Sequence, residues 1–346
     1  MTNTIFFGPD ALTALGELLR RPAVSQVFVL TDSNTGRLCY PLLQPYLPTE
    51  HTVIELPAGE EAKTLASCET VWSELTDRRA DRHAVLMNLG GGVLTDLGGF
   101  CAALYKRGIR FVQVPTTLLA QVDASVGGKT GVDFQGFKNQ LGVFQEPAAV
   151  CIDPQFLRTL DPRQLKSGYA EIVKHSLIAD AAAFQEQRQT GMFIEDWTAT
   201  IQASVALKQS IVAQDPLEAG PRKLLNFGHT VGHALESYLL VQPGREILHG
   251  EAVAAGIVCE AWLSVQRGLL GADALDQIET FLFSVFEKVQ FVLLETDAIA
   301  EYAWQDKKNA GSVINCTLLQ GIGQGIYDQP VTIRELADSL RYYHRL

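Results

Sequence analysis

The chain has 346 residues, which exceeds the ~250–300 residues at which single hydrophobic cores stop growing, so we expect two domains. A net charge of −11 argues against nucleic acid as a partner, because a phosphate backbone demands a basic surface. No apolar stretch approaches the ~20 residues that cross a bilayer, and the N-terminus lacks the basic and apolar regions of an export signal. We therefore expect a cytoplasmic protein that binds neither nucleic acid nor membrane.

The six cysteines stand singly in the sequence, with no C-x-x-C pair among them. This spacing predicts buried, small hydrophobic side chains in a reducing compartment. It agrees with a cytoplasmic location.

The first part of the chain alternates between strand and helix patterns. Apolar and β-branched runs predict strands at Val27–Thr31, His51–Leu56, Ala84–Leu89, Arg110–Val114 and Val150–Asp153. Helical spacing predicts helices at Thr64–Arg79, with Thr64 as the N-cap, and at Val93–Tyr105. This alternation predicts an α/β, Rossmann-like nucleotide-binding domain at residues 1–160, with helices on both faces of a parallel sheet.

The pattern changes after Asp161-Pro162, where long segments with a period of 3.6 residues follow one another. The predicted helices are Arg163–Ala179, Ala181–Arg188, Thr198–Val212, Pro221–Leu240, Glu251–Arg267, Ala272–Glu287 and Thr332–Tyr342. Only Val313–Leu319 has a strand pattern. We therefore predict a mainly helical, all-α C-terminal domain at residues 161–346.

The stretch Asn88–Asn139 is the richest in candidate functional residues. The glycines Gly90–Gly92 follow an apolar strand and precede a helix, so backbone N–H groups and the helix N-terminus can approach phosphate oxygens. The loop lacks G-x-G-x-x-G spacing and is therefore a variant of the dinucleotide-binding loop. Asp32, at the end of a predicted strand, is a candidate to hold ribose hydroxyl groups. These features predict a dinucleotide site, and the nearby lysines and carboxylates predict chemistry beside it.

Three of the seven histidines lie close together in the sequence. His229 and His233 are four residues apart, on one face of a helix, and His249 begins an apolar helix. Glu171 supplies a carboxylate from another apolar helix. Two or three imidazoles and one carboxylate form a tetrahedral site for a metal such as Zn²⁺, with a position left for substrate. The alternative is a set of histidines that lie in the core or in solvent and bind no metal.

Cations stand on several of the predicted helices and in one turn: Lys174, Lys208, Arg222, Lys307 and Lys308. Together, near a metal motif, they predict a site for a multiply anionic small molecule. Singly, Glu171 and Lys174 also fit an intrahelical ion pair, and the other lysines fit a solvated face. Glu218, in a loop flanked by glycine and proline, is either a general base or a first-turn carboxylate favoured by the helix dipole.

The sequence resembles the 3-dehydroquinate synthase family over nearly its whole length. The motifs that carry the resemblance are G-G-G-V-L-T-D, Y-K-R-G-I, P-T-T-L-L-A-Q-V-D-A-S-V-G-G-K-T-G, A-E-I-V-K, R-K-L-L-N-F-G-H-T-V-G-H and H-G-E-A-V. Enzymes of this family are lyases of the shikimate pathway, which leads to chorismate and the aromatic amino acids. The resemblance implies conversion of 3-deoxy-D-arabino-heptulosonate 7-phosphate to 3-dehydroquinate and phosphate. It also implies a homodimer with NAD⁺ and Zn²⁺, or alternatively Co²⁺, as cofactors.

The resemblance assigns roles to individual residues. NAD⁺ would be bound by Asp32, Glu60, Lys63, Gly91, Gly92, Val93, Asp96, Thr116, Thr117, Lys138, Phe156 and Thr159. The metal would be bound by Glu171, His229 and His249. The phosphorylated sugar acid would be bound by Arg107, Asp123, Lys129, Asn139, Lys174, Lys208, Arg222, Asn226 and one of Lys307 or Lys308. Glu218, His233 and Lys129 would be catalytic, with Glu218 and His233 as acid–base residues, so that His233 carries a proton and is not a ligand.

The implied reaction is redox-neutral. NAD⁺ takes a hydride from the substrate, phosphate leaves by elimination, the hydride returns, and an aldol closure forms the ring. Pro216 departs from the family pattern, because a second acidic residue usually stands there. Three alternatives remain: a related cyclase with a 2-deoxy-scyllo-inosose or valiolone-type product, a polyol dehydrogenase that releases NADH, and a non-catalytic metabolite-binding module.

Overall fold

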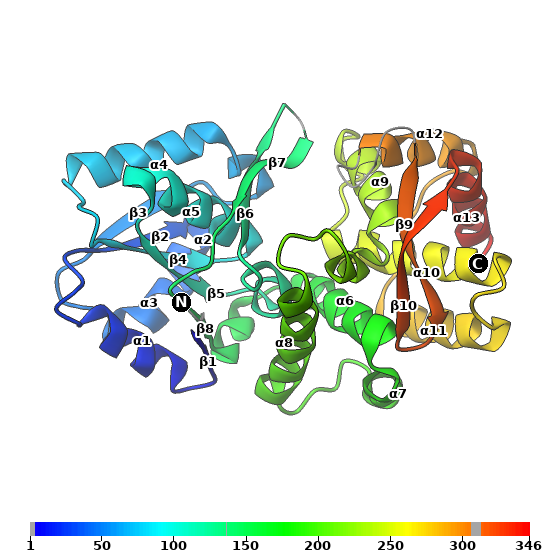
Figure 1. The fold of residues 1–346 in the computed structure, drawn as a ribbon, viewed down its shortest axis with the longest axis horizontal. Helices are drawn as coiled ribbons and strands as arrows, with labels where there is room; N and C mark the ends of the chain where they lie inside the picture. The colour runs from blue at the N-terminus through cyan, green and yellow to red at the C-terminus, as the bar shows by residue number, and fades with distance from the viewer. Residues whose placement is uncertain (1–3, 136, 306–312) are drawn as a thin grey trace. The chain divides into compact units, whose positions relative to one another are not determined.

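A computed structural model describes residues 4–135, 137–305 and 313–346 of the chain (Figure 1). The chain divides into two compact units. The first comprises Met1–Leu165 and Trp197–Val205, and the second comprises Lys166–Asp196 and Ala206–Leu346. Among the described helices, none combines the length and the apolar character that a bilayer-spanning segment requires.

Among the described residues, the first unit contains a six-stranded sheet whose pairings are all parallel. Its strands, in their order across the sheet, are β1 (Thr4–Phe7), β8 (Ala149–Ile152), β5 (Arg110–Pro115), β4 (Val85–Gly90), β2 (Val27–Asp32) and β3 (Thr52–Leu56). The five strands predicted for this part of the chain are confirmed. The edge strand β1 was not predicted.

Helices cover both faces of this sheet, as predicted. They are α1 (Ala11–Leu19), α2 (Ser33–Leu38), α3 (Tyr40–Leu43), α4 (Leu65–Asp77) and α5 (Gly92–Leu104). The helices α4 and α5 pack on one face around Phe28 and Leu86, and α1 and α3 pack on the other around Val29 (Figure 1). Thr64 is the N-cap of α4, as predicted, since its hydroxyl accepts a hydrogen bond from the N–H of Ser67 at 3.3 Å.

The strand order reverses at β2 and β4. The chain runs outward from β2 to β3 and then returns to β4 on the other side of β2. In open α/β sheets, ligands bind beyond the carboxyl ends of the strands at such a reversal. Asp32 ends β2, and Gly90 ends β4 directly before α5. Gly90 pairs with Pro115, the last residue of β5, so the candidate dinucleotide residues collect at one edge of the sheet.

The segment between β5 and β8 holds two elements that periodicity did not predict. The strands β6 (Lys129–Phe134) and β7 (Phe137–Phe144) form an antiparallel pair. Before them, Ala120–Ala124 forms a turn of π-helix that contains Asp123. Such turns occur often at functional sites.

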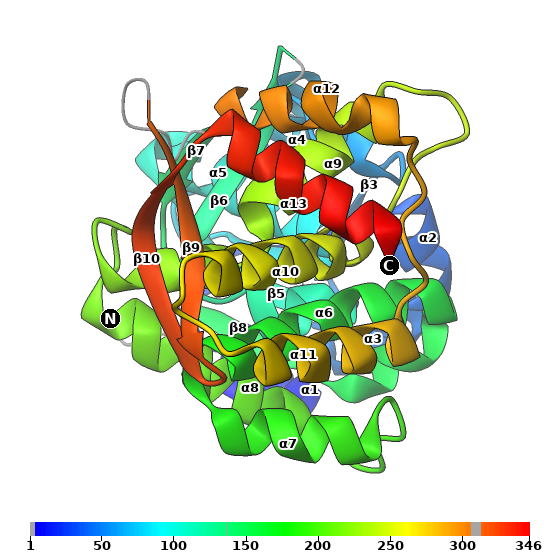
Figure 2. The same cartoon turned by 90° about the vertical axis from the view of Figure 1, so that its right-hand side faces the viewer.

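The second unit is mainly helical, as predicted. The helices that lie wholly or partly in it are α6 (Pro162–Ala179), α7 (Ala181–Thr190), α8 (Trp197–Gln214), α9 (His229–Leu240), α10 (His249–Gln266), α11 (Ala272–Val285), α12 (Thr296–Glu301) and α13 (Ile333–Arg345). The strand predicted near the end is confirmed as β9 (Ile314–Gly321), and its antiparallel partner β10 (Gln324–Val331) was not predicted. The helix α10 is central, because it packs against α9, α11, α13 and β9 (Figure 2).

The prediction of one continuous helix over Pro221–Leu240 is wrong. Pro221–Asn226 forms a 3-10 helix, η6, and α9 begins only at His229. Gly228 separates them with a left-handed φ of +78°, which favours glycine. Tertiary packing requires glycine at this position too, since a Cβ on Gly228 would lie 2.9 Å from the carbonyl oxygen of Val253.

The helices α9 and α10 approach each other backbone to backbone. A Cβ on Gly256 of α10 would overlap the carbonyl oxygen of Gly228, directly before α9. A Cβ on Gly232 of α9 would lie 2.9 Å from the carbonyl oxygen of Ala252. Glycine at these positions therefore sets the separation of the two helices.

We expect Gly256→Ala to lower the free energy of unfolding by ~1–3 kcal/mol, because the added methyl group pushes α9 away from α10. Equilibrium urea unfolding of the purified protein measures this change. Gly271→Ala is the matched control, since a Cβ there meets nothing within 4 Å. The control should change the free energy by less than ~1 kcal/mol. Equal stability of the two variants would contradict a fixed separation of the helices.

Candidate functional site

Three histidine rings of the second unit lie against one another. The centroid of His229 is 5.1 Å from that of His233 and 5.3 Å from that of His249. His229 and His233 belong to α9, and His249 is the first residue of α10, as the sequence predicts. One nitrogen from each ring lies within 4.8 Å of the nitrogens of the other two. The rings therefore bring their donor atoms to one place.

The carboxylate of Glu171 reaches the same place from α6. Its Oε1 lies 3.6 Å from Nε2 of His229 and 3.5 Å from Nε2 of His249. The Glu171 side chain is 0% exposed, and it forms the intrahelical ion pair with Lys174 that their spacing allows. One carboxylate and two imidazoles at these separations are a donor set for Zn²⁺ or another first-row divalent ion. The three residues predicted as metal ligands thus meet in the structure.

The second ring nitrogen of each candidate ligand has a partner of its own. Nδ1 of His229 lies 3.1 Å from the backbone carbonyl oxygen of Phe227, and Nδ1 of His249 lies 3.2 Å from Oε2 of Glu236. An N–H at Nδ1 that donates to these oxygens leaves the lone pair of Nε2 on the side of Glu171. Ligand histidines in metalloproteins are held in this way. Both the donor set and its supports therefore fit a metal ion.

Negative charge surrounds His249. Burial lowers the pKa of its ring, but the hydrogen bonds to Glu171 and Glu236 outweigh burial and raise the pKa to about 10. In the metal-free chain the ring therefore carries a proton at neutral pH. A site that stabilises this proton also favours a cation in its place.

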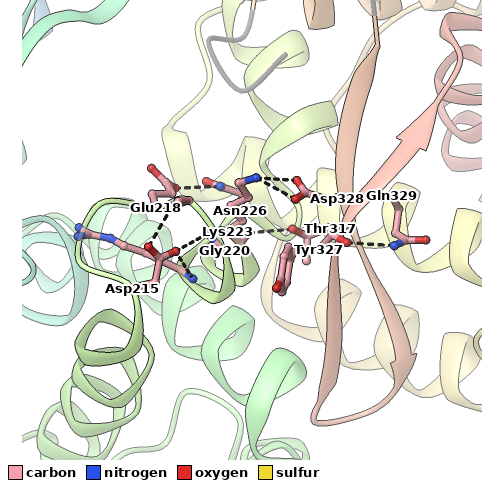
Figure 3. Close-up of polar contacts among 11 residues, drawn as sticks. Asp215, Glu218, Gly220, Lys223, Asn226, Thr317, Tyr327, Asp328 and Gln329 are labelled. Carbon is pink, nitrogen blue, oxygen red and sulfur yellow. Dashed lines mark hydrogen bonds and ion pairs between the residues drawn. The ribbon is translucent and has the colours of Figure 1, made fainter. Parts of the chain in front are cut away.

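Asp215 organises the loop that precedes α9 (Figure 3). Its carboxylate accepts hydrogen bonds from three later N–H groups: Ala219 at 3.0 Å, Gly220 at 2.6 Å and Arg222 at 3.2 Å. The guanidinium of Arg222 donates to the backbone carbonyl oxygen of Pro216 at 2.5 Å. Asp215 thus fixes the conformation of this loop, which has proline at position 216.

Glu218 and Asn226 meet at this loop. Nδ2 of Asn226 donates to Oε1 of Glu218 at 3.0 Å, so the candidate base is held by a candidate substrate residue. On the other side of the loop, the ammonium of Lys223 binds Asp328 of β10 at 2.8 Å (Figure 3). The carbonyl oxygen of Lys223 accepts a hydrogen bond from the hydroxyl of Thr317 on β9 at 2.8 Å. The β9–β10 pair therefore fixes the loop from outside.

The predicted cations of the second unit are buried. Lys174 is 1% exposed, Lys208 5% and Arg222 2%. The solvated-face interpretation of Lys208 is therefore wrong. Burying a cation is costly unless it meets anions or hydrogen-bond acceptors, so such residues are more typical of a ligand site. The candidates Lys307 and Lys308 lie outside the described residues.

The candidate dinucleotide loop lies at the ends of β4 and β5. Gly91 is the N-cap of α5, and a Cβ there would lie 2.9 Å from Cγ2 of Thr117. The N–H of Thr116 donates to the carbonyl oxygen of Gly90 at 3.0 Å, which ties the loop to the end of β5. Gly92 and Val93 then open α5. The backbone N–H groups at this helix start are the expected anion donors.

Asp32 has a local role that the sequence did not predict. It is the N-cap of α2, and its Oδ1 accepts hydrogen bonds from the N–H groups of Asn34 and Thr35 at 2.9 and 2.7 Å. This cap fixes the carboxylate at the end of β2. The position still agrees with a residue that faces a nucleotide at the strand reversal.

Four other candidates for NAD⁺ binding form two ion pairs. The pairs are Lys63–Asp96 at 2.7 Å and Lys138–Glu60 at 3.6 Å. The side chain of Phe156 lies in the core. The backbone carbonyl oxygen of Phe156 accepts a hydrogen bond from the hydroxyl of Thr159 at 2.7 Å. Any contact of Phe156 with a nucleotide would therefore involve its backbone.

Left-handed backbone marks three of the candidate residues. Among the described residues, seven non-glycine residues have positive φ, and Arg107 (+65°), Asn139 (+51°) and Glu218 (+61°) are among them. Such conformations are uncommon and persist where the surrounding structure holds them, often at functional sites. Of the remaining substrate candidates, Asp123 lies in the π-helical turn and Lys129 begins β6.

Three carboxylates that hold the Glu218 loop, the His249 ring and the start of α9 were not predicted as functional from the sequence. They are Asp215, Glu236 and Glu260. Glu236 stands seven residues after His229, on the same face of α9, and this spacing was a signal for it. Glu260 is an acidic residue within the apolar run of α10, which was a second signal. Asp215 offered no comparable pattern.

Two family models match the chain in succession. The model for the 3-dehydroquinate synthase N-terminal region matches residues 53–167, and the model for the C-terminal region matches residues 168–309. A 3-dehydroquinate synthase from Parabacteroides distasonis is 40% identical over 338 residues, which are 96% of each chain. The chain belongs to the 3-dehydroquinate synthase family. The fold and the family predicted from the motifs are thereby confirmed.

Solved structures of sugar phosphate cyclases share the fold of this family member. A 2-epi-5-epi-valiolone synthase from Streptomyces hygroscopicus, solved with NAD⁺ and Zn²⁺, has a TM-score of 0.87 and 28% identity, and the match covers 100% of this chain and 97% of that one. A 2-deoxy-scyllo-inosose synthase, solved with carbaglucose-6-phosphate, NAD⁺ and Co²⁺, has a TM-score of 0.83 and 25% identity over 98% and 96% of the chains.

We expect Zn²⁺ binding to release about one proton per chain near about pH 8, because a ligand imidazole must be deprotonated. His249 holds that proton in the metal-free chain, and release should vanish as pH rises through its pKa of about 10. Titration calorimetry in buffers of different ionisation enthalpy measures the release. Glu236→Gln, which removes one of the two carboxylates that raise this pKa, should release less. Identical heats in all buffers would contradict this prediction.

Proposed function

We propose that this chain is a 3-dehydroquinate synthase, which converts 3-deoxy-D-arabino-heptulosonate 7-phosphate to 3-dehydroquinate and phosphate. Family membership supports the reaction. The single observation that carries it is the meeting of Glu171, His229 and His249, each imidazole with a partner at Nδ1.

We propose NAD⁺ and a divalent metal, Zn²⁺ or alternatively Co²⁺, as cofactors. When bound, NAD⁺ would supply hydride transfer from and back to the substrate, and the metal would polarise the hydroxyl group that is oxidised. The residues that would hold NAD⁺ are Asp32, Glu60, Lys63, Gly91, Gly92, Val93, Asp96, Thr116, Thr117, Lys138, Phe156 and Thr159. The glycine loop at the strand reversal supports this assignment.

The substrate carries a carboxylate and a phosphate, and the chain offers buried cations for such groups. Lys208 and Arg222 are buried and separate in sequence, so they can bind different anionic groups. The substrate residues would be Arg107, Asp123, Lys129, Asn139, Lys174, Lys208, Arg222, Asn226 and Lys307, the last of which lies outside the described residues.

The acid–base residues would be Glu218 and His233, with Lys129 as a further catalytic residue. Asn226 holds the carboxylate of Glu218 at 3.0 Å, so its proton-accepting oxygen has a defined place. The ring of His233 lies 5.1 Å from that of His229 and 5.7 Å from that of His249, between centroids. A nitrogen of His233 lies within 4.8 Å of a nitrogen of each other ring, so its role as a proton carrier and not a ligand rests on the family resemblance.

We further propose a division of roles between two domains and a dimeric assembly. Residues 1–160 would bind the nucleotide, and residues 161–346 would bind the metal and the substrate. The protein would be a cytoplasmic homodimer without nucleic-acid partners. The exposed Arg107, which has a left-handed backbone, would reach a phosphate across the dimer interface. All six cysteines are buried, which agrees with a reducing compartment.

The decisive experiment supplies purified protein with Zn²⁺, catalytic NAD⁺ and 3-deoxy-D-arabino-heptulosonate 7-phosphate. We expect phosphate and 3-dehydroquinate in equal amounts without lasting NADH absorbance, because the hydride returns to the product. Net NADH would indicate a polyol dehydrogenase instead. Turnover of other sugar phosphates, with none of this substrate, would indicate a cyclase like the solved neighbours.

We expect Lys208→Ala to weaken substrate binding by ~10–100-fold, which is the loss of a charged hydrogen bond in a buried site. NAD⁺ binding should stay within about twofold, because a cation that binds the substrate does not contact the nucleotide. Titration calorimetry with each ligand separates the two effects. Lys288→Ala is the matched control. It removes another lysine, whose ammonium binds the backbone carbonyl oxygen of His344 and which is not a candidate for substrate binding. Equal losses for both ligands would point to misfolding.

A further inference from the structure

The start of α9 is capped by a side chain from another helix. Its own N-cap is Gly228, which has no side chain to accept the first N–H groups of the helix. Glu260 of α10 takes this role. Its Oε2 accepts from the N–H of Gly228 at 2.6 Å, and its Oε1 accepts from the N–H groups of Thr230 and Val231 at 2.9 and 3.1 Å. Both carboxylate oxygens thus bind the start of the helix.

Glu260 lies where a carboxylate is otherwise costly. It is 0% exposed, within the sequence A-V-A-A-G-I-V-C-E-A of α10. A buried carboxylate is tolerated when it is fully hydrogen-bonded, and charge-assisted bonds at a helix N-terminus are favourable. A Ser or Asp at position 228 would be the ordinary cap, but the left-handed φ and the contact with α10 require glycine there. The cap therefore has to come from α10.

The same peptide group links Glu260 to a candidate metal ligand. The N–H of Gly228 and the carbonyl group of Phe227 belong to one planar peptide unit. Its N–H binds Glu260 at 2.6 Å, and its carbonyl oxygen lies 3.1 Å from Nδ1 of His229. Glu260 therefore orients the acceptor that orients the His229 ring. A hydrogen bond at the N–H also polarises the peptide unit and strengthens its carbonyl oxygen as an acceptor.

Glu260 also connects the two helices that supply the imidazoles. His249 begins α10, and Glu260 follows eleven residues later, about three turns on, along the same face. His229 begins α9, which Glu260 caps. His249 has its own carboxylate, Glu236, in direct contact with Nδ1. A carboxylate thus supports each candidate ligand ring. Glu236 contacts the His249 ring directly, and Glu260 acts on the His229 ring through the Phe227–Gly228 peptide group.

We propose that Glu260 is a positioning residue of the metal site. It acts through the Phe227–Gly228 peptide on His229, and touches neither metal nor substrate. It sets the place and the basicity of the His229 ring relative to His249. This inference rests on the proposed function only for the assignment of these histidines as metal ligands.

The test is the variant Glu260→Gln, which keeps the shape of the side chain but removes its charge and directs an N–H₂ group at backbone donors. We expect Zn²⁺ affinity to fall by ~10–100-fold, as is typical when the support of a ligand is removed. Competition with a chromophoric chelator measures this affinity. The absorption spectrum of the Co²⁺-loaded protein should change as well, because it reports ligand geometry.

Ser264→Ala is the matched control. Ser264 lies one turn after Glu260 on α10, is also buried, and donates its hydroxyl to the carbonyl oxygen of Glu260. Its loss should lower the melting temperature, because the hydroxyl also accepts a hydrogen bond from the N–H of Leu319. Zn²⁺ affinity should stay within about twofold and the Co²⁺ spectrum unchanged, since the hydroxyl binds the backbone of Glu260, whereas the cap of α9 is its carboxylate. Wild-type affinity and spectrum in Glu260→Gln would overturn the proposal.

A second measurement needs no variant. Amide hydrogen exchange of the wild-type protein should show stronger protection of Gly228, Thr230 and Val231 when Zn²⁺ is added, because the metal fixes the ring that their peptide groups support. Unchanged protection at saturating Zn²⁺ would also overturn the proposal. Failure of the proposed function is distinguishable, because wild-type protein would then form no 3-dehydroquinate whatever the effect of Glu260 on metal binding.

Discussion

The close packing of three helices is the constraint on which the candidate metal site depends. Its ligands come from α6, α9 and α10, so they meet only if these helices keep fixed separations. On one side of α10, a Cβ on Gly250 would overlap the carbonyl oxygen of Ser167 in α6, and the Ser167 hydroxyl accepts a hydrogen bond from the N–H of Gly250 at 2.9 Å. On the other side, Gly256 lies against Gly228 at the start of α9. Glycines without side chains thus place the imidazoles within coordination range.

Three buried carboxylates act on the site in addition to this packing. Glu171, Glu236 and Glu260 are all buried, and a buried carboxylate needs donors or a cation. Glu260 is satisfied by backbone N–H groups, whereas Glu171 and Glu236 both face His249 and raise its pKa. The second unit therefore concentrates negative charge where the imidazole rings of His229 and His249 also meet. That combination selects a divalent cation over an anion.

Periodicity and motifs predicted what depends on neighbouring residues. The strand ends, the glycine loop before α5 and the placement of His249 at the start of α10 all follow from local patterns. The break before α9 did not, because Gly228 adopts its conformation through contacts with α10, which follows later in the chain. Burial of Lys208 and the role of Glu260 were hidden for the same reason. A sequence shows that a charged residue stands in an apolar helix, but not which backbone it meets.

The loop of Glu218 shows how local strain and long-range support are combined. A left-handed backbone at a non-glycine residue costs of order 1–3 kcal/mol, so Glu218 would relax if nothing held it. Asp215 binds the N–H groups that follow Glu218, and Asn226 binds its carboxylate. From outside, the β9–β10 pair holds Lys223 through its ammonium and its carbonyl group. These contacts hold the loop of Glu218 in place with proline at position 216.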